Sequence, residues 1–299
     1  RWDKMKDLEP RVELYINNVL FATDFSPAAE APFSYATAIA DRYQSKLYVA
    51  HIINIESFDL LEPGTARGVI KKAHDEAQRK ITQLISPLGL PRHRYQIVVA
   101  EGAVSEALVD IIEQNRIDLA IIGTHGRRAF KKLLMGSVAE EVFRMAPCPV
   151  LTVGPKSAPT PVYRELRHIL YAVEFAPDKS KAAGYAVSLA ERYSAGLTVL
   201  NVREDMPAAS SRTEEFPPAF RRWINDHVPE HSDLRNRIRF ERGFGPASDS
   251  ILDFAAKEGV DLIVMSVRKL DPFIAARHPR SGTSHEVISH SPCPVLTIR

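Results

Sequence analysis

Short apolar segments alternate with longer segments of mixed character along the first half of the chain. The apolar segments carry Val, Ile and Leu at nearly every position, as expected for parallel strands that are covered on both faces. They span residues 17–22, 46–52, 95–100, 118–123 and 149–153. The segments between them repeat apolar residues every three or four positions, which indicates amphipathic helices. We expect these helices at residues 27–43, 68–86, 103–115 and 137–145.

This alternation predicts an α/β unit in which a five-stranded parallel sheet has helices on both faces. With right-handed crossovers the simplest strand order is 3-2-1-4-5. That order is doubly wound, because the winding direction reverses between the first and fourth strands. The first helix has its own start signal, since Ser26 is a favourable N-cap residue and Pro27 suits the first helical position.

A second unit of the same kind follows the first. Residues 20–52 align with residues 170–202 at a constant offset, and "RIDLAIIGT" and "APCPVLTV" recur as "GVDLIVMSV" and "SPCPVLTI". At about 150 residues per domain, a chain of this length suits two domains. The predicted boundaries are domain 1 at 1–154, a proline-rich linker at 155–166, and domain 2 at 167–299.

The composition is that of an ordinary globular protein, with 45% hydrophobic and 25% charged residues,. The net charge of +2 is too small to argue for nucleic acid or a membrane surface as a partner,. The N-terminal residues lack the apolar core of a signal peptide, and no apolar run is long enough to span a membrane. We expect a soluble cytoplasmic protein with no nucleic-acid or membrane partner.

The two cysteines, Cys148 and Cys293, occupy the same position of the two repeats, in the string "PCPVLT". They lie far apart and outside any CxxC pattern, which excludes a disulfide framework and a cysteine-based zinc site. We interpret them as buried structural thiols. Redox chemistry is the alternative, although no neighbouring residue in the sequence would lower a thiol pKa.

Ligands of doubly wound sheets bind outside the carboxyl ends of the strands where the winding reverses. In the first unit these strands end in "ATDFS" and "GTHG", so both turns face one crevice. Gly123 ends the strand, Gly126 can adopt a positive φ, and Gly136 precedes a helix whose first N–H groups and dipole attract anions. The loop between these glycines adds four cations: Arg127, Arg128, Lys131 and Lys132.

This arrangement predicts a phosphate site. The alternative is that Ser137 to Glu140 form a capping box, in which side chains satisfy the first N–H groups of the helix. A capping box would explain Ser137 and Glu140 but leave the two earlier glycines without a role.

The pattern G-x2-G-x9-G-S after an apolar strand, with "TDFS" after the first strand and "PCPVLTV" closing the domain, resembles the universal stress protein family. The resemblance covers essentially the whole chain as two tandem domains. The spacing in domain 1 matches the ATP-binding branch of the family without a gap. The resemblance implies a Rossmann-like fold of the adenine nucleotide alpha hydrolase-like type, with ATP and Mg²⁺ bound across the crevice.

The resemblance also implies which residues contact the nucleotide. The nucleoside end would contact Ala22, Thr23, Asp24 and Ile52. The ribose and phosphates would contact Gly123, His125, Gly126 and Arg127. The phosphate chain would be held by Gly136, Ser137 and Val138. Mg²⁺ would bridge phosphate oxygens, so no protein side chain is expected to ligate the metal.

Domain 2 departs from this motif. In place of Asp24, Ser26, Gly123 and Gly126 it carries Glu174, Ala176, Ser266 and Lys269. Its loop before Gly282 is longer and lacks glycine, so its backbone cannot form the same anion nest. Thr283 and Glu286 also read as a capping box. We therefore expect the nucleotide in domain 1 only.

Other sites have weaker support. No G-x-G-x-x-G follows the first strand and no P-loop string occurs, which argues against nicotinamide and P-loop sites. A zinc site from Asp24, His51 and His125 is an alternative at the same crevice, although these residues share no local ligand spacing. In the stretch 235–242, Arg235, Arg237 and Arg239 would share one face of a solvated edge strand rather than form a nucleic-acid surface.

Hydrolysis of ATP needs a group that positions the attacking water, and no carboxylate pair or triad is readable beside the expected phosphates. We predict an ATP-binding regulatory protein of the stress response that is at most a slow ATPase. The alternative is a two-domain interaction scaffold that binds no nucleotide.

The strands "PVLTV" and "PVLTI" end the two sheets, and an exposed apolar edge invites pairing. The resemblance implies that domains pair through this last strand, so the halves would pack as a pseudo-dimer. The sequence leaves open a homodimer of whole chains.

Overall fold

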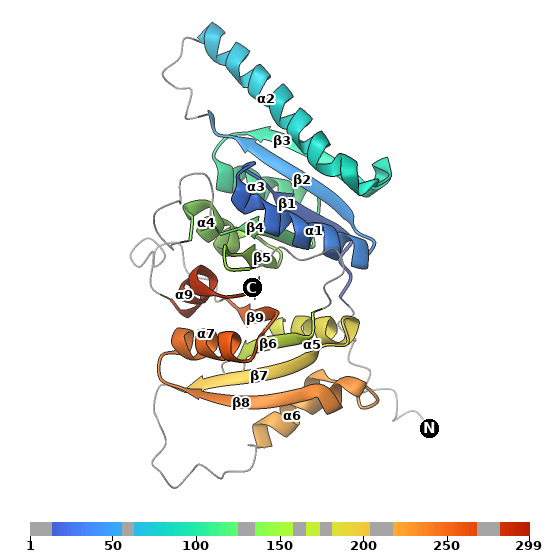
Figure 1. The fold of residues 1–299 in the computed structure, drawn as a ribbon, viewed down its shortest axis with the longest axis vertical. Coiled ribbons are helices and arrows are strands. Elements are labelled where there is room, and N and C mark those ends of the chain that lie inside the picture. The colour runs from blue at the N-terminus through green and yellow to red at the C-terminus, as the bar shows by residue number, and fades with distance from the viewer. Residues whose placement is uncertain are drawn as a thin grey trace, which may run out of the picture.

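The computed structural model describes residues 14–55, 63–124, 135–157, 166–173, 181–203, 218–267 and 282–299. Figure 1 shows two α/β units stacked along the long axis, each with its strands in the middle and helices on both sides.

The first unit contains five strands and four α-helices in the alternating order that the sequence predicts. Its strands are β1 (Asn18–Ala22), β2 (Lys46–Ile53), β3 (Tyr95–Glu101), β4 (Leu119–Gly123) and β5 (Val150–Val153). Its helices are α1 (Glu30–Arg42), α2 (Pro63–Ile85), α3 (Val104–Gln114) and α4 (Ser137–Met145). Short 3-10 helices cover Pro27–Ala29, Ser86–Leu88 and Arg92–Arg94.

The second unit repeats this order. Its strands are β6 (His168–Val173), β7 (Gly196–Arg203), β8 (Ile238–Phe244), β9 (Leu262–Ser266) and β10 (Val295–Ile298). Its helices are α5 (Ala182–Arg192), α6 (Pro218–His227), α7 (Ala247–Lys257) and α9 (Thr283–His290), with a 3-10 helix at Asp233–Arg237.

All ten strands join into one sheet of order β3-β2-β1-β4-β5-β10-β9-β6-β7-β8. The first unit therefore has the predicted order 3-2-1-4-5, and its strands pair in parallel. The tandem doubly wound α/β fold is confirmed.

The start of the first helix differs from the prediction. The chain forms a 3-10 turn at Pro27–Ala29 before α1 begins at Glu30, and no side chain of the described residues caps this turn. The carbonyl of Ser26 accepts the N–H of Ala29 at 3.0 Å, while the Ser26 hydroxyl is buried with no hydrogen-bond partner in the described part of the chain. Ser26 thus holds the N-cap position without acting through its side chain.

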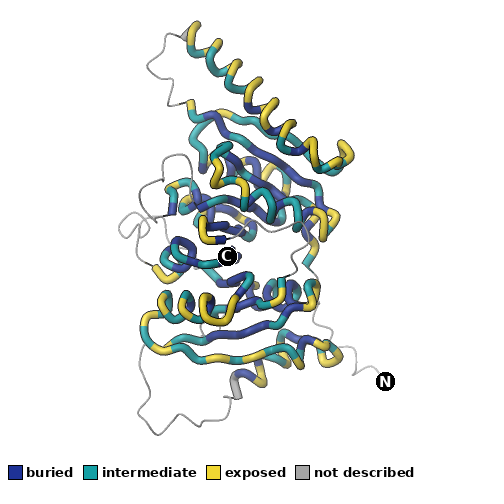
Figure 2. The backbone as a smooth tube through the Cα atoms, in the orientation of Figure 1, coloured by how far each residue is buried: buried dark blue, intermediate teal, exposed yellow. Residues whose placement is uncertain are grey.

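The apolar strand residues alternate between the two faces of the sheet and build one hydrophobic cluster on each face. Val19 and Phe21 belong to the cluster under α1, α2, α5 and α6, whereas Leu20 belongs to the cluster under α3, α4, α7 and α9. Each cluster contains residues of both units. Figure 2 shows the consequence, with buried strands inside and exposed positions on the outer helix faces.

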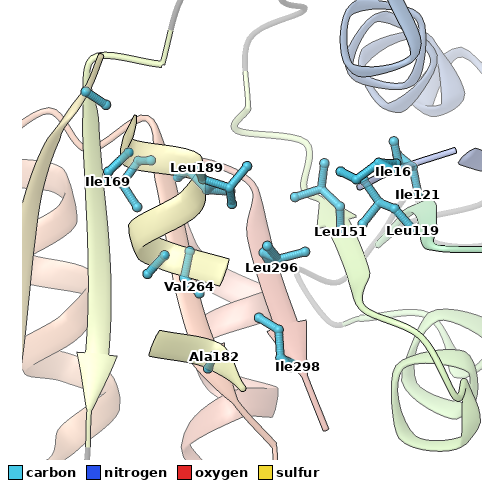
Figure 3. Packing of buried hydrophobic residues seen from close by; sticks show 14 of the residues in the cluster. Ile16, Leu119, Ile121, Leu151, Ile169, Ala182, Leu189, Val264, Leu296 and Ile298 are labelled. Carbon is cyan, nitrogen blue, oxygen red and sulfur yellow. The ribbon is translucent and has the colours of Figure 1, made fainter. Parts of the chain in front are cut away.

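The units meet where β5 and β10 pair antiparallel, with Leu151 opposite Leu296. Two threonines add reciprocal bonds across this pair. Thr152 Oγ1 donates to the carbonyl of Val295 at 3.1 Å, and Thr297 Oγ1 donates to that of Val150 at 3.2 Å. Figure 3 shows the apolar side chains that face each other from the two units at this level of the sheet.

Replacing Leu296 with Ala tests this packing, because its side chain is 4% exposed and lies opposite Leu151. We expect the Leu296→Ala variant to lose about 2–5 kcal/mol of unfolding free energy, the usual cost of this truncation in a core. Urea unfolding followed by circular dichroism measures the loss. The control is Met145→Ala, where the side chain is 42% exposed and the expected cost is about 1 kcal/mol or less,. Equal losses would contradict a packed interface.

Candidate functional site

The chain leaves β1 in a tight turn that is held by its own polar groups. Thr23 is buried, and its N–H donates to the carbonyl of Ala50 in β2 at 2.9 Å. Its Oγ1 accepts the N–H of Phe25 at 3.0 Å, and Asp24 Oδ1 accepts the N–H of Ser26 at 2.9 Å. Phe25 has a φ of 59°, a left-handed conformation that a non-glycine residue adopts only where its surroundings stabilise it,. The two side-chain bonds provide this stabilisation.

His51 supports the same turn from the neighbouring strand. Its Nδ1 lies 2.7 Å from the carbonyl oxygen of Thr23, and its ring lies 4.5 Å from that of Phe25. A carbonyl can only accept a hydrogen bond, so this geometry requires the proton on Nδ1. His51 therefore has a structural role in the turn. Metal-ligating histidines are commonly oriented by a hydrogen bond of this kind, so it does not count against the zinc alternative.

The other zinc candidates add little to that alternative. His125 lies outside the described residues. The described part of the chain contains no group of three or more His, Cys, Asp and Glu side chains that could hold a metal ion.

The second turn follows β4 and is closed by backbone hydrogen bonds. Gly123 pairs with Val153 of β5, and the N–H of Thr124 donates to the carbonyl of Val153 at 3.0 Å. The N–H of Gly136 then donates to the carbonyl of Thr124 at 2.7 Å. The chain therefore leaves the sheet at Thr124, which is 1% exposed, and returns beside it at Gly136. Thr124 was not among the predicted residues, since only the fold reveals that its carbonyl closes this loop.

The helix α4 begins directly at this closure, and its N-cap residue is Gly136, with φ −67° and ψ 147°. Ser137 is the first helical residue, and no side chain of the described residues caps the helix. With Gly136 as the N-cap, the glutamate of a capping box would stand at residue 139, and Glu140 lies one position beyond it. The Glu140 carboxylate instead pairs with Arg144 at 2.9 Å. The capping-box alternative is therefore wrong. The helix begins with backbone N–H groups that no described side chain caps.

Strand register brings the two turns to one edge of the sheet. Phe21 of β1 pairs with Ile121 of β4, so the residues after Ala22 and the end of β4 emerge side by side. Most predicted contacts lie at this carboxyl edge: Ala22, Thr23, Asp24, Ile52, Gly123, Gly136, Ser137 and Val138. The remaining three lie outside the described residues: His125, Gly126 and Arg127.

The equivalent edge of the second unit is described only in part. Ser266 ends β9, and Gly282 is the N-cap residue of α9 without a side-chain cap from the described residues. The predicted Thr283 capping box is therefore wrong as well, because Thr283 is the first helical residue. Glu174, Ala176 and Lys269 lie outside the described residues, so the expected loss of the site stays a prediction.

The basic stretch before β8 differs from the expected edge strand. Arg235 and Arg237 lie in a 3-10 helix, and only Arg239 lies in the strand. Arg235 donates to the carbonyl of Val228 at 2.7 Å and Arg237 to that of Ala195 at 2.6 Å. Two of the three guanidinium groups therefore form hydrogen bonds to backbone carbonyls of this chain. Both belong to the 3-10 helix, where the alternation of a strand does not apply.

Both cysteines are buried, and burial raises the pKa of each thiol to about 12. In Cys293, a hydrogen bond from Ser291 opposes this shift without cancelling it. The interpretation as buried structural thiols is confirmed, since a reactive thiol needs a lowered pKa.

Two doubly wound α/β units, joined through their last strands and with polar turns at the carboxyl edge of the first, define a tandem protein of the Rossmann-like class. The model of the Universal stress protein family matches residues 16–154 and, a second time, residues 165–299. The chain belongs to the universal stress protein family, as the sequence motifs predict.

Individual relatives agree with this assignment. Universal stress protein MJ0531 of Methanocaldococcus jannaschii is 27% identical over 139 residues, which cover 45% of this chain and 80% of the relative. Universal stress protein A homolog 1 of Coxiella burnetii is 28% identical over 148 residues, which cover 48% and 99%. A solved universal stress protein of Archaeoglobus fulgidus has a TM-score of 0.69 at 19% identity, covering 94% of this chain and 95% of its own. That likeness shows the fold of both units.

Within the described ranges, no helix has both the length and the apolar character needed to span a membrane.

Labelling with iodoacetamide at pH 9 tests the state of the thiols. An exposed thiol has an ordinary pKa of 9.0 and is half ionised at this pH, whereas burial raises the pKa of Cys148 and Cys293 to about 12, so both are almost fully protonated at pH 9. We expect labelling of the native protein to be at least about 100-fold slower than in urea. The same shift makes stability fall as the pH rises from about 9 to 12, because only the unfolded thiols lose their protons there. Fast labelling of either cysteine in the native protein would contradict a buried, protonated thiol.

Proposed function

We propose that this protein binds ATP with Mg²⁺ at the carboxyl edge of the first unit and serves as a cytoplasmic regulatory protein of the stress response. The observation that carries the proposal is the start of α4. A helix with no described side-chain cap begins at the edge of the sheet where the winding reverses, beside the turn after β1. In a universal stress protein with the full glycine motif, this arrangement supports a bound polyphosphate.

In this proposal the turn after β1 binds the nucleoside end of ATP. The backbone N–H of Thr23 is bonded to Ala50, and its carbonyl is bonded to His51. We therefore assign Thr23 and His51 the task of holding the turn in shape. Asp24 is half-buried, and its Oδ1 accepts the N–H of Ser26. A carboxylate has two oxygens and accepts several hydrogen bonds, so Asp24 suits the hydroxyl groups of a ribose. Ala22 and Ile52 would border the adenine.

The first turn of α4 binds the phosphate end in this proposal. The N–H of Gly136 is bonded to Thr124, so we assign phosphate binding to the N–H groups of Ser137 and Val138. A helix N-terminus carries a partial positive charge that favours an anion there. In this proposal Gly136 contributes by leaving the approach to the helix N-terminus open. A Cβ at this position would lie at contact distance from the Thr124 carbonyl oxygen, 3.4 Å away.

The rest of the phosphate site stays a prediction. Gly123, His125, Gly126 and Arg127 complete it in this proposal, and Mg²⁺ bridges phosphate oxygens.

Little hydrolysis is expected from this arrangement. Two of the acidic and histidine side chains at this edge are Asp24, on the nucleoside side of the proposed site, and His51, which is hydrogen-bonded to the turn. Neither is placed to position a water molecule against the terminal phosphate.

We also propose that only one of the two units binds the nucleotide. Domain 1 (1–154) would carry the nucleotide, and domain 2 (167–299), which follows the linker 155–166, would not. The scaffold alternative is favoured by one observation, namely that the two units share a continuous sheet and two continuous hydrophobic clusters. A pseudo-dimer of this kind needs no nucleotide to hold it together.

A matched pair of substitutions tests the nucleotide site. Gly136 and Gly282 are the N-cap residues of α4 and α9, and both have φ values that any residue adopts. We expect Gly136→Val to weaken the binding of ATP and Mg²⁺ at least about tenfold, because the branched side chain blocks the approach to the helix N-terminus. Gly282→Val should bind as the parent does, although it bears the same loss of a good N-cap residue. Titration calorimetry measures both affinities.

Equal affinities of these two variants would show that the site is assigned wrongly. The scaffold alternative makes a different prediction. It expects no heat from ATP, ADP or AMP in the parent protein, and no nucleotide released when the purified protein is denatured.

We also propose that the two units remain joined through β5 and β10 in solution. Leu296→Asp would place a carboxylate at a buried position of the interface, and unpaired buried charge is strongly unfavourable,. We expect small-angle X-ray scattering to fit the compact structure for the parent and a larger radius of gyration for this variant. The control is Phe244→Asp at the far edge, where the side chain is 37% exposed. Two freely moving units in the parent protein would refute the pairing.

A further inference from the structure

A cavity of about 240 Å³ lies between the two units, away from the proposed nucleotide site. It is lined by residues of α1 and α5 and by strand residues from the middle of the ten-stranded sheet. Figure 3 shows part of its wall. Leu189 and Leu296 of the second unit lie on one side, and Ile16, Leu119 and Leu151 of the first unit lie on the other. The nucleotide residues belong to the carboxyl edge of the first unit, and none of them lines this cavity.

The wall of the cavity is built from equivalent positions of the two repeats. Tyr35 and Tyr185 correspond in the sequence alignment, as do Tyr43 and Tyr193, and all four line the cavity. It therefore lies on the pseudo-two-fold axis that relates the units. Neither unit alone would form it, because both contribute residues to the wall.

The two units are linked beside the cavity by a reciprocal contact. Arg42 Nη2 donates to the carbonyl of Arg192 at 2.5 Å, and Arg192 Nη2 donates to that of Arg42 at 3.2 Å. The guanidinium of Arg42 lies 4.9 Å from the ring centre of Tyr193, and that of Arg192 lies 5.3 Å from that of Tyr43. These contacts hold two of the four tyrosine rings in place. The wall is thus preorganised rather than formed around a ligand.

The chemistry of the wall selects against an anion. Its charged residues are Asp41, Arg42 and Asp118, which leave an excess of one negative charge. Arg42 is engaged with the second unit, and Asp118 Oδ2 accepts the backbone N–H groups of Asn17 and Asn18. The remaining wall is aliphatic or phenolic. Burial raises the pKa of the Tyr193 hydroxyl to about 12, so this phenol stays uncharged.

The size and the rings of the cavity indicate what it accommodates. A dry apolar cavity of about 150 Å³ holds benzene, so a larger one admits a second ring. Aromatic side chains favour aromatic partners through offset and edge-to-face packing. We propose that this cavity is a second binding site, which takes an uncharged aromatic molecule of one or two rings and bridges the two units. Because such a ligand contacts both units, its binding stabilises their pairing.

Indole, an uncharged two-ring molecule, is a suitable probe. Calorimetry with the full chain should show saturable binding of one indole in the millimolar range or tighter, unchanged by ATP and Mg²⁺. Ala38 lines the cavity, and Ala38→Phe would fill it. We expect this variant to bind indole at least about tenfold more weakly. The control is Ala256→Phe, on an exposed position of α7 that does not line the cavity, which should retain the parent affinity within about twofold,.

A second measurement avoids any dependence on the folding of the Ala38 variant. In parent protein labelled with 3-fluorotyrosine, indole should shift the fluorine resonances of Tyr35, Tyr43, Tyr185 and Tyr193 but not that of Tyr95 in β3. Competition by ATP would place indole at the nucleotide site and overturn the proposal. Equal binding by a folded Ala38→Phe variant, or shifts confined to other tyrosines, would overturn it too. Tighter binding of indole-3-acetate or octanoate than of indole would overturn it in favour of an organic acid.

Discussion

The strands Val150–Val153 and Val295–Ile298 are only four residues long, and every residue in both is buried. Each strand would be an apolar edge if its unit stood alone, with unpaired backbone groups along one side. Their antiparallel pairing removes both edges at once and satisfies the backbone groups that a buried strand cannot leave unpaired. The sheet thereby becomes continuous from β3 to β8, and the hydrophobic cluster on each face runs through both units. The cavity on the pseudo-two-fold axis exists only because of this pairing.

The pairing also sets what surrounds the proposed nucleotide site. The helix α4 leads directly into β5, and α9 leads into β10, so the two helices approach each other across the junction. His285 of α9 is buried, and its Nε2 lies 3.9 Å from Glu140 Oε2 of α4. The helix to which we assign phosphate binding is therefore in contact with the second unit, in which the glycine motif is degenerate. This contact gives the second unit a physical connection to the proposed nucleotide site.

Much of the candidate site could be predicted from the sequence, because the relevant residues follow recognisable strands. The ends of β1 and β4 were predictable as neighbours from strand order alone, and both carry their distinctive residues within a few positions of the strand end. The hydrogen bonds of the site were not predictable. Ser26 and Ser137 have the residue type of helix caps, yet the first helical turn begins differently at each, and neither side chain caps a helix. The hydrogen bond from His51 to the carbonyl of Thr23 forms because β2 lies beside β1 and brings the His51 ring to the turn.

The sequence by itself determined the two α/β units, their strand order and both ends of the helix α4. These features depend on apolar periodicity and on right-handed crossovers, which are local or nearly universal rules. Only the tertiary structure decided which polar groups pair, as Arg235 and Arg237 show by donating to backbone carbonyls where a solvated strand was expected. Only the tertiary structure produced the cavity between Tyr35, Tyr43, Tyr185 and Tyr193, because a space between two units depends on how residues distant in sequence pack together,.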